Sequence, residues 1–116
     1  MQKVTGGCHC GAVRFEAEAD TANTMTCNCS HCQIKGMILT FTPQDNLRIT
    51  KGEDSLKEYR FNKHVIAHQF CPTCGVEPFA KATAPDGREM AAINMRCVDG
   101  AEPDQMTPKM FDGRKL

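Results

Sequence analysis

The spacing of the cysteines constrains this chain more than any other feature of its sequence. Of eight cysteines, three lie within the six residues Cys27-Asn28-Cys29-Ser30-His31-Cys32. A C-x-C step followed by x-x-C can wrap three sulfurs around one point through a tight turn, and Zn²⁺ favours soft thiolate ligands in tetrahedral geometry. Three protein ligands leave one tetrahedral position open, which is the usual form of a catalytic zinc site. The spacing therefore predicts an open zinc site formed by Cys27, Cys29 and Cys32.

Four further cysteines come from two distant segments. Cys8-His9-Cys10 lies near the start of the chain, and Cys71-Pro72-Thr73-Cys74 lies past its middle. Gly75 follows the second segment, as expected where a knuckle turn needs a positive φ. Four thiolates complete a tetrahedron, so we predict a closed structural zinc site. A disulfide between Cys71 and Cys74 is the alternative. The predicted ligands are Cys8, Cys10, Cys71 and Cys74, and the chain is expected to bind two zinc ions.

Length and composition predict a single small domain over residues 1–116. Aromatic residues make up only 6% and Trp is absent, which predicts a thin core to which bound zinc contributes folding energy. The N-terminus leads into no apolar run, and no stretch is long enough to span a bilayer, so we expect a cytoplasmic protein with no membrane partner. In a reducing cytoplasm eight cysteines favour metal ligation over disulfides.

The charge distribution argues against nucleic acid as a partner. Basic and acidic residues balance at 14 each, and there is no basic run. Seven thiolates and two Zn²⁺ would take the formal charge from zero to about −3. Bound metal therefore makes a nucleic-acid partner still less favourable.

Hydrophobic periodicity predicts a mainly β fold of short antiparallel strands with little helix. Residues 12–19 alternate apolar and charged side chains, and the apolar run 37–42 is expected to be a central strand. A single helical turn is expected over 30–35, with Ser30 as N-cap and Gly36 as its end. Irregular structure is expected from Asp99 onward. Further strands are predicted at 25–27, 47–50, 56–61, 65–70, 78–83 and 90–97.

Several residues near these motifs have more than one reading. His31 is a candidate general base, a candidate fourth ligand that would make the triad zinc structural, or a solvated loop residue. His68 could face the site, although a core or surface position is favoured. Cys97 is favoured as a buried core thiol over a pocket residue. Arg14 and Arg96 could bind a carboxylate, although an arginine on an alternating strand is usually solvated.

Taken together, the motifs resemble one known family. The segments Gly6-Gly7-Cys8-His9-Cys10-Gly11, Cys27 to Cys32, Phe70 to Gly75 and Asn94-Met95-Arg96-Cys97 resemble the glutathione-dependent formaldehyde-activating enzymes, a family that also includes centromere protein V-like proteins. The resemblance implies an Mss4-like β fold with two zinc sites, the first and last cysteine pairs forming the structural one. It assigns the middle triad to catalysis.

The resemblance also implies an activity. The family joins the thiol of glutathione to formaldehyde to give S-hydroxymethylglutathione, and the class is carbon–sulfur lyase. A substrate thiol bound to the triad zinc would lose its proton at neutral pH and be held beside an aldehyde. We therefore expect a lyase that acts on a small thiol and a small aldehyde, with Cys27, Cys29 and Cys32 as catalytic residues. The alternative is a non-catalytic, zinc-stabilised binding module.

Overall fold

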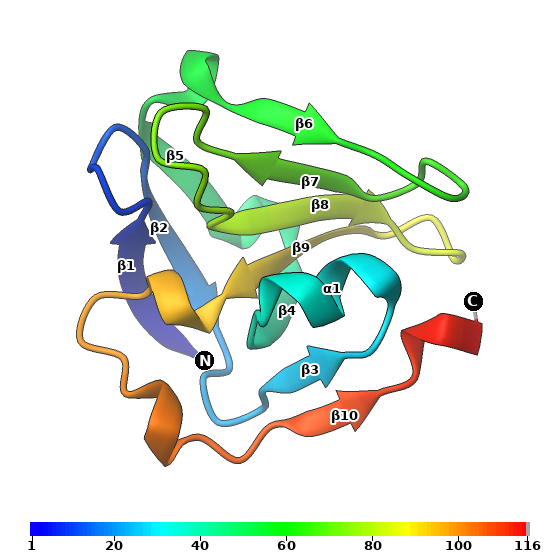
Figure 1. The fold of residues 1–116 in the computed structure, drawn as a ribbon. Coiled ribbons are helices and arrows are strands. Elements are labelled where there is room, and N and C mark those ends of the chain that lie inside the picture. The colour runs from blue at the N-terminus through cyan, green and yellow to red at the C-terminus, as the bar shows by residue number, and fades with distance from the viewer. Residues whose placement is uncertain (116) are drawn as a thin grey trace.

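The computed structural model describes residues 1–115 and is mainly β in that range, with ten strands and one α-helix (Figure 1). The helix α1 spans Ser30–Lys35, and short 3-10 turns follow at Met95–Cys97 and Gly113–Lys115. None of the described helices is long and apolar enough to cross a bilayer. The strands are β1 Gln2–Gly7, β2 Arg14–Ala19, β3 Met25–Cys27, β4 Leu39–Pro43, β5 Leu47–Lys51, β6 Lys57–Tyr59, β7 Ala67–Phe70, β8 Phe79–Thr83, β9 Glu89–Asn94 and β10 Lys109–Phe111.

The strands β1, β2 and β5 form an antiparallel sheet with β2 in its centre. The alternation of β2 directs Phe15, Ala17 and Ala19 into the interior, because successive side chains of a strand point to opposite faces. At the end of β1 the backbone passes so close to the chain after β9 that a side chain at Gly6 would collide with the Cys97 carbonyl. This close approach sets the first cysteine knuckle beside the end of β9.

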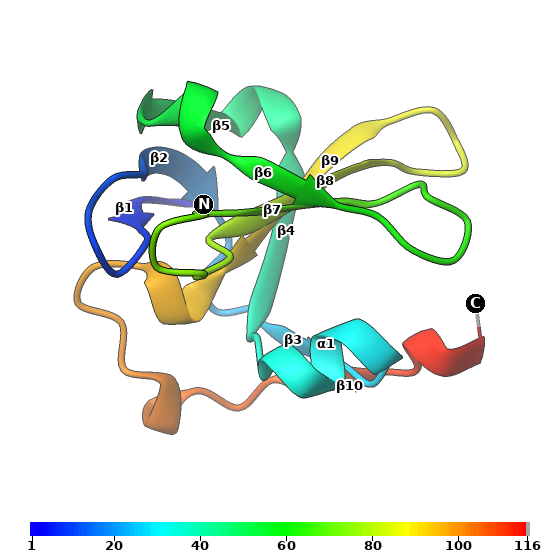
Figure 2. The ribbon, with the colours of Figure 1, turned by 45° about the horizontal axis from the view of Figure 1, so that its top comes forward.

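The second sheet has seven strands in the order β10-β3-β4-β9-β8-β7-β6. All its pairs are antiparallel except β10 with β3, which is parallel. Figure 2 shows β3, β10 and α1 gathered below the remaining strands, with β4 running between the two parts. The strand that carries Cys27 and the strand that ends in the second knuckle therefore belong to one sheet.

The main apolar cluster lies between the two sheets. Phe15 from β2 meets Phe79 from β8 edge to face, with ring centroids 5.8 Å apart, and Ile93 and Ala91 from β9 complete the contact. Burial of each phenylalanine stabilises the fold by about 1.5–3 kcal/mol. Two smaller buried clusters are built on cysteines. They consist of Cys8, Val13 and Cys71, and of Cys32, Met37 and Leu39.

The structure confirms the mainly β class and the helical turn that Gly36 ends, at a φ of 69°. The predicted strands are found, and the run 37–42 yields β4, which lies between β3 and β9 inside the sheet. The predicted strand 90–97 ends at Asn94, because the Asn94 side chain accepts a hydrogen bond from the Arg96 N–H and begins a 3-10 turn.

Two expectations are wrong. Cys29, not Ser30, is the N-cap of α1, because its sulfur accepts a hydrogen bond from the N–H of Cys32. The segment after Asp99 is not wholly irregular, because Lys109–Phe111 pairs with β3 as β10. The three residues of β10 are all exposed, so no alternation of apolar and polar side chains marks the strand in the sequence. Its pairing depends on the free edge of β3.

Candidate metal centres

The four-cysteine set comes together at one point. Cys8 and Cys10 lie in the loop between β1 and β2, Cys71 and Cys74 lie in the loop between β7 and β8, and all four sulfurs lie within 4.8 Å of one another. The Sγ–Sγ distance is 3.7 Å for Cys8–Cys10 and again for Cys10–Cys71. Four sulfurs placed tetrahedrally at about 2.3 Å from zinc lie about 3.8 Å apart. The donor set and its spacing therefore fit Zn²⁺.

Local backbone geometry prepares each knuckle for this site. Gly11 and Gly75 both have a φ near 80°, a conformation that glycine adopts without strain. The turn at the second knuckle closes with a hydrogen bond from the Gly75 N–H to the Cys71 carbonyl at 2.7 Å. In the first knuckle the Val13 N–H donates to the Cys8 sulfur at 3.3 Å. Hydrogen bonds of this kind stabilise a ligating thiolate and fix its direction.

Without a bound cation, the thiols of the four-cysteine site differ in pKa. Backbone hydrogen bonds from Cys10 and Val76 lower the pKa of Cys74 to about 6. A backbone hydrogen bond at Ala12 favours the Cys10 thiolate, but burial and the neighbouring sulfurs outweigh it and raise the pKa of Cys10 to about 11. A divalent cation removes the conflict, because each coordinated thiol is deprotonated.

The cysteine triad lies where β3 meets α1. Cys27 ends β3, Cys29 caps the helix and Cys32 is buried in its first turn, with the three sulfurs within 4.8 Å of one another. The Cys29 N–H donates to the Cys27 sulfur at 3.5 Å, and the Cys32 N–H donates to the Cys29 sulfur at 3.4 Å. The end of β3 and the start of α1 together direct the three thiols toward one point, as a three-ligand zinc site requires.

The triad thiols differ in their readiness to ionise. Burial raises the pKa of Cys32 strongly and also raises the pKa of Cys27. Burial works against the Cys29 thiolate as well, but hydrogen bonds from the backbone N–H of Cys32 and the neighbouring thiols lower its pKa overall. Cys29 is therefore the thiol most ready to bind a metal, and the two others would ionise on coordination.

The end of the described chain packs against the triad. A side chain on Gly113 would collide with the Cys27 sulfur, and the Asn28 amide donates to Asp112 at 2.9 Å. The Arg114 guanidinium donates to the Asn28 carbonyl at 2.7 Å. The sequence did not predict this contact. The glycine at 113 is its only local sign, and only the pairing of β10 with β3 brings it to the cysteines.

His31 does not join the triad, although it lies between two of its ligands in sequence. Among residues 1–115 the groups able to hold a metal place His31 with His68 and Glu77, while the three sulfurs form a group without it. Its side chain is only 11% exposed and packs against His68, with ring centroids 3.9 Å apart and the planes tilted by 34°. His31 is therefore neither a solvated loop residue nor placed as a fourth ligand of the triad.

Glu77 is a site residue that the sequence did not reveal. Its side chain is 1% exposed, with Oε2 at 2.8 Å from His68 Nδ1 and Oε1 at 3.4 Å from His31 Nε2. Lys35 Nζ lies 3.9 Å from the same Oε1. Burial lowers the pKa of His31, which favours the neutral imidazole. In the sequence, the only local sign of this role was the position of a carboxylate between a zinc knuckle and an apolar strand.

A cleft of about 580 Å³ reaches Glu77 and the first knuckle at Cys8, but no cysteine of the triad lines it. Lys35, Glu77 and Arg96 line it, and so does Cys97, whose pKa burial raises to about 11. Cys97 is half-buried against the main cluster, so it is both a packing residue and part of the cleft wall. Arg14 also lines the cleft, where its guanidinium pairs with Asp99.

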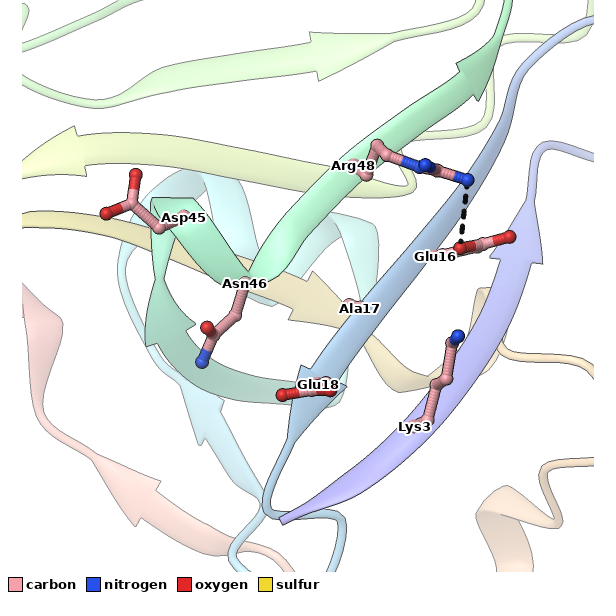
Figure 3. A pocket seen from close by; sticks show the side chains of 7 residues that line it. All are labelled: Lys3, Glu16, Ala17, Glu18, Asp45, Asn46 and Arg48. Carbon is pink, nitrogen blue, oxygen red and sulfur yellow. Dashed lines mark hydrogen bonds and ion pairs between the residues drawn. The ribbon is translucent and has the colours of Figure 1, made fainter.

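A second, smaller hollow of about 280 Å³ lies on β2 and β5 (Figure 3). Arg48 Nη2 and Glu16 Oε2 form an ion pair of 3.3 Å across it. None of its lining residues is a cysteine or a histidine, and among residues 1–115 its carboxylates do not form one of the groups able to hold a metal ion. The lining residues are Lys3, Glu16, Ala17, Glu18, Asp45, Asn46 and Arg48.

Comparison with known proteins shows the family of this chain. The family model for the glutathione-dependent formaldehyde-activating enzyme matches residues 3–112. The fold is similar to the crystal structure of a Rhodobacter sphaeroides protein, with a TM-score of 0.82 and 30% sequence identity over 92% of this chain and 99% of that one. The matched range includes every predicted cysteine ligand. The chain therefore belongs to the glutathione-dependent formaldehyde-activating enzyme family.

Proposed function

We propose that the protein is a zinc-dependent carbon–sulfur lyase that joins a small thiol to a small aldehyde and also catalyses the reverse reaction. The observation that carries this proposal is the contrast between the two cysteine sites. Four sulfurs converge in one, and three converge in the other without His31. A closed set suits a structural zinc ion, whereas three protein ligands suit a catalytic one. Membership of the family supports glutathione and formaldehyde as the first substrates to test.

In the forward reaction the sulfur of the thiol attacks the carbonyl carbon of the aldehyde. The S–C bond forms, the carbonyl π bond breaks, and the proton released by the thiol ends on the new hydroxyl oxygen. Zn²⁺ at the triad would supply a position at which a substrate thiol is deprotonated at neutral pH. The protein contributes mainly by holding thiolate and aldehyde together, because proximity alone can lower such a barrier substantially.

The cleft supplies charges that suit a thiol bearing carboxylates. Arg96 and Lys35 line it, and the Arg96 Nε–H donates to the Gly36 carbonyl at 2.9 Å, which fixes the guanidinium at the end of α1. The other N–H groups of that guanidinium are donors suited to a carboxylate. Because α1 also carries Cys32, a carboxylate held by Arg96 would lie beside the helix that forms the triad.

The four-cysteine site has a structural role in this proposal. It links the loop after β1 to the loop after β7, so bound zinc would contribute directly to folding. Thiolate ligands require reduced cysteines, and a reducing compartment such as the cytoplasm meets that requirement.

The test is NMR exchange between free and adduct carbon, using ¹³C-formaldehyde with glutathione, cysteine and other small thiols. Fully metallated protein should speed the exchange above the uncatalysed rate, and Cys29→Ser should abolish the increase. Ser30→Ala, an exposed neighbour of the triad, is the matched control and should keep it. If no small thiol shows an increase with metallated protein, the chain is a zinc-stabilised binding module instead.

A further inference from the structure

His31, His68 and Glu77 form a buried polar cluster that the proposed lyase chemistry does not use. They come from α1, from β7 and from the segment between the second knuckle and β8. In residues 1–115 the buried side-chain polar atoms without a hydrogen-bond partner are His31 Nδ1, His68 Nε2 and Glu77 Oε1, and all three belong to this cluster. A buried polar atom left unpaired costs about 1–3 kcal/mol, so these atoms need water or a bound ion as partners, beyond the contacts of Glu77 Oε1 with His31 at 3.4 Å and Lys35 at 3.9 Å.

The spacing of the cluster resembles that of ligands around one ion. His31 Nε2 lies 3.4 Å from Glu77 Oε1, which matches the separation of two ligands, whereas the 2.8 Å between His68 Nδ1 and Glu77 Oε2 is a hydrogen bond that a metal ion would replace. Two ligand atoms that each lie about 2.1 Å from a metal are about 3.0–3.4 Å apart in octahedral or tetrahedral geometry. One ligand atom from each residue can be chosen so that all three lie within 4.8 Å of one another.

We propose that His31, His68 and Glu77 bind a divalent first-row transition metal ion, at a third metal site separate from the two cysteine sites. Two imidazoles and one carboxylate are a ligand set that suits Zn²⁺ or Fe²⁺ and leaves positions open for water or substrate. This ligand set contains no thiolate, so the metal ions that it prefers differ from those that the cysteine sites prefer. Metal binding at this site can be measured without the proposed lyase activity, and the two share the cleft that Lys35 and Glu77 line.

The aromatic surroundings hold the two imidazoles in place. The His31 ring stacks on Tyr59 at 5.7 Å and on Phe61 at 5.5 Å between centroids, and Phe61 also stacks on His68 at 5.7 Å. Side chains fixed in this way lose little further freedom when they bind an ion, which favours binding.

Lys35 balances the charge of Glu77 in the metal-free protein. Its ammonium lies 3.9 Å from Glu77 Oε1, and its side chain is 34% exposed, so it can move into solvent when a divalent cation arrives. Lys35 and Glu77 also line the cleft, which gives an ion a route to the cluster. Lys35 and the metal therefore compete for the same carboxylate.

The proposal is tested on protein loaded with two equivalents of Zn²⁺, which the softer thiolate sites take first. This protein is then titrated with Co²⁺. Co²⁺ bound to thiolates gives strong sulfur-to-metal charge-transfer bands, whereas Co²⁺ on imidazole and carboxylate gives only weak d–d bands. We expect one additional equivalent to bind with d–d bands alone, and parallel titrations with Zn²⁺ and Fe²⁺ will show which ion binds more tightly.

Variants tie this equivalent to the cluster. Glu77→Gln and His68→Gln should each weaken binding of the third ion by more than the roughly 10–100-fold typical of a lost outer-shell partner, with both cysteine sites still filled. Lys35→Met should tighten it about tenfold, because a competing positive charge is removed. His64→Asn is the control and should change nothing, because His64 is exposed and Asn tolerates its φ of 58°.

Three results would overturn the site. They are no additional equivalent at millimolar Co²⁺, charge-transfer bands on the additional ion, or undiminished binding in Glu77→Gln and His68→Gln. Circular dichroism checks that these two variants fold. If either does not, Lys35→Met decides the question, and an unchanged affinity in that variant counts against the site.

Discussion

The Sγ atoms of Cys10 and Cys71 lie 3.7 Å apart, although the two residues are separated by 61 positions in sequence. The contact joins the loop after β1 to the loop after β7, and Cys71 itself is fully buried. A metal held there closes a long loop. It stabilises the folded state, because without this link the unfolded chain has much more conformational freedom.

Replacing Cys71 should therefore be severely destabilising. Cys71→Ser removes one ligand of the closed site, and bound zinc contributes folding energy directly. The loss should consume much of a stability that is on the order of 5–15 kcal/mol for a small domain. We expect insoluble or poorly folded protein, measured by soluble yield, circular dichroism melts and metal content. Thr73→Ala, an exposed change in the same knuckle, should behave like the natural sequence.

Replacing Cys29 should have a different effect. The triad is a local loop whose ends are already close in sequence, so less chain entropy depends on its metal. Cys29→Ser should keep the fold and the four-cysteine zinc while losing the triad zinc and any thiol–aldehyde exchange. The measurements are the melting curve and the zinc content per chain. A melt as damaged as that of Cys71→Ser would make the triad a structural site.

Chelator titration should remove the two cysteine-bound zinc ions in separate steps. The four-thiolate site has one more protein ligand than the triad, so it should hold its metal more tightly. Metal released at each chelator concentration is counted in the natural sequence and in Cys29→Ser, which should lack the first step. Removal of both ions in one step would contradict the assignment of two unequal sites.

Acidification should empty the triad before the four-cysteine site. Protons compete with zinc for thiolates, and they compete best for thiols of high pKa. In the triad, burial raises the pKa of Cys32 and Cys27, while the pKa of Cys29 is lowered by hydrogen bonds. In the four-cysteine site, backbone hydrogen bonds lower the pKa of Cys74 to about 6 and also lower that of Cys71, while the pKa of Cys10 is raised to about 11. Because the triad has two raised values and one lowered, and the four-cysteine site one raised and two lowered, triad zinc should be released at the higher pH, measured with a zinc indicator. Release of the four-cysteine zinc first would show that ligand protonation does not control the order.

A methyl group at position 113 should disturb the triad from outside. Gly113→Ala places a Cβ against the Cys27 sulfur, so either the C-terminal segment or the cysteine must move. Affinity for the triad zinc should fall about tenfold, as for other partners that pack on a ligand. Competition with a chelator measures this affinity, and Lys115→Ala, an exposed neighbour, is the control. Equal affinities in both variants would mean that the segment does not support the site.

The sequence supported some of these conclusions by itself. The alternation in Arg14–Ala19 and the apolar run before Pro43 each predicted a strand, because the period of side-chain burial is a local property of the backbone. The cysteine spacings predicted the triad and each half of the four-cysteine site for the same reason, since C-x-C and C-x-x-C steps bring thiols together over a few residues. The meeting of the two halves is a long-range contact that the fold provides.

Only the tertiary structure decided the rest. The cap of α1 is Cys29 and not Ser30, because the direction of the entering strand determines which side chain meets the free N–H groups. The pairing of β10 with β3 sets Gly113 against Cys27. The cluster of His31, His68 and Glu77 joins a helix, a strand and a loop that have no common spacing. A single buried carboxylate has no sequence pattern of its own, so its partners emerge only when strands far apart in the chain lie side by side.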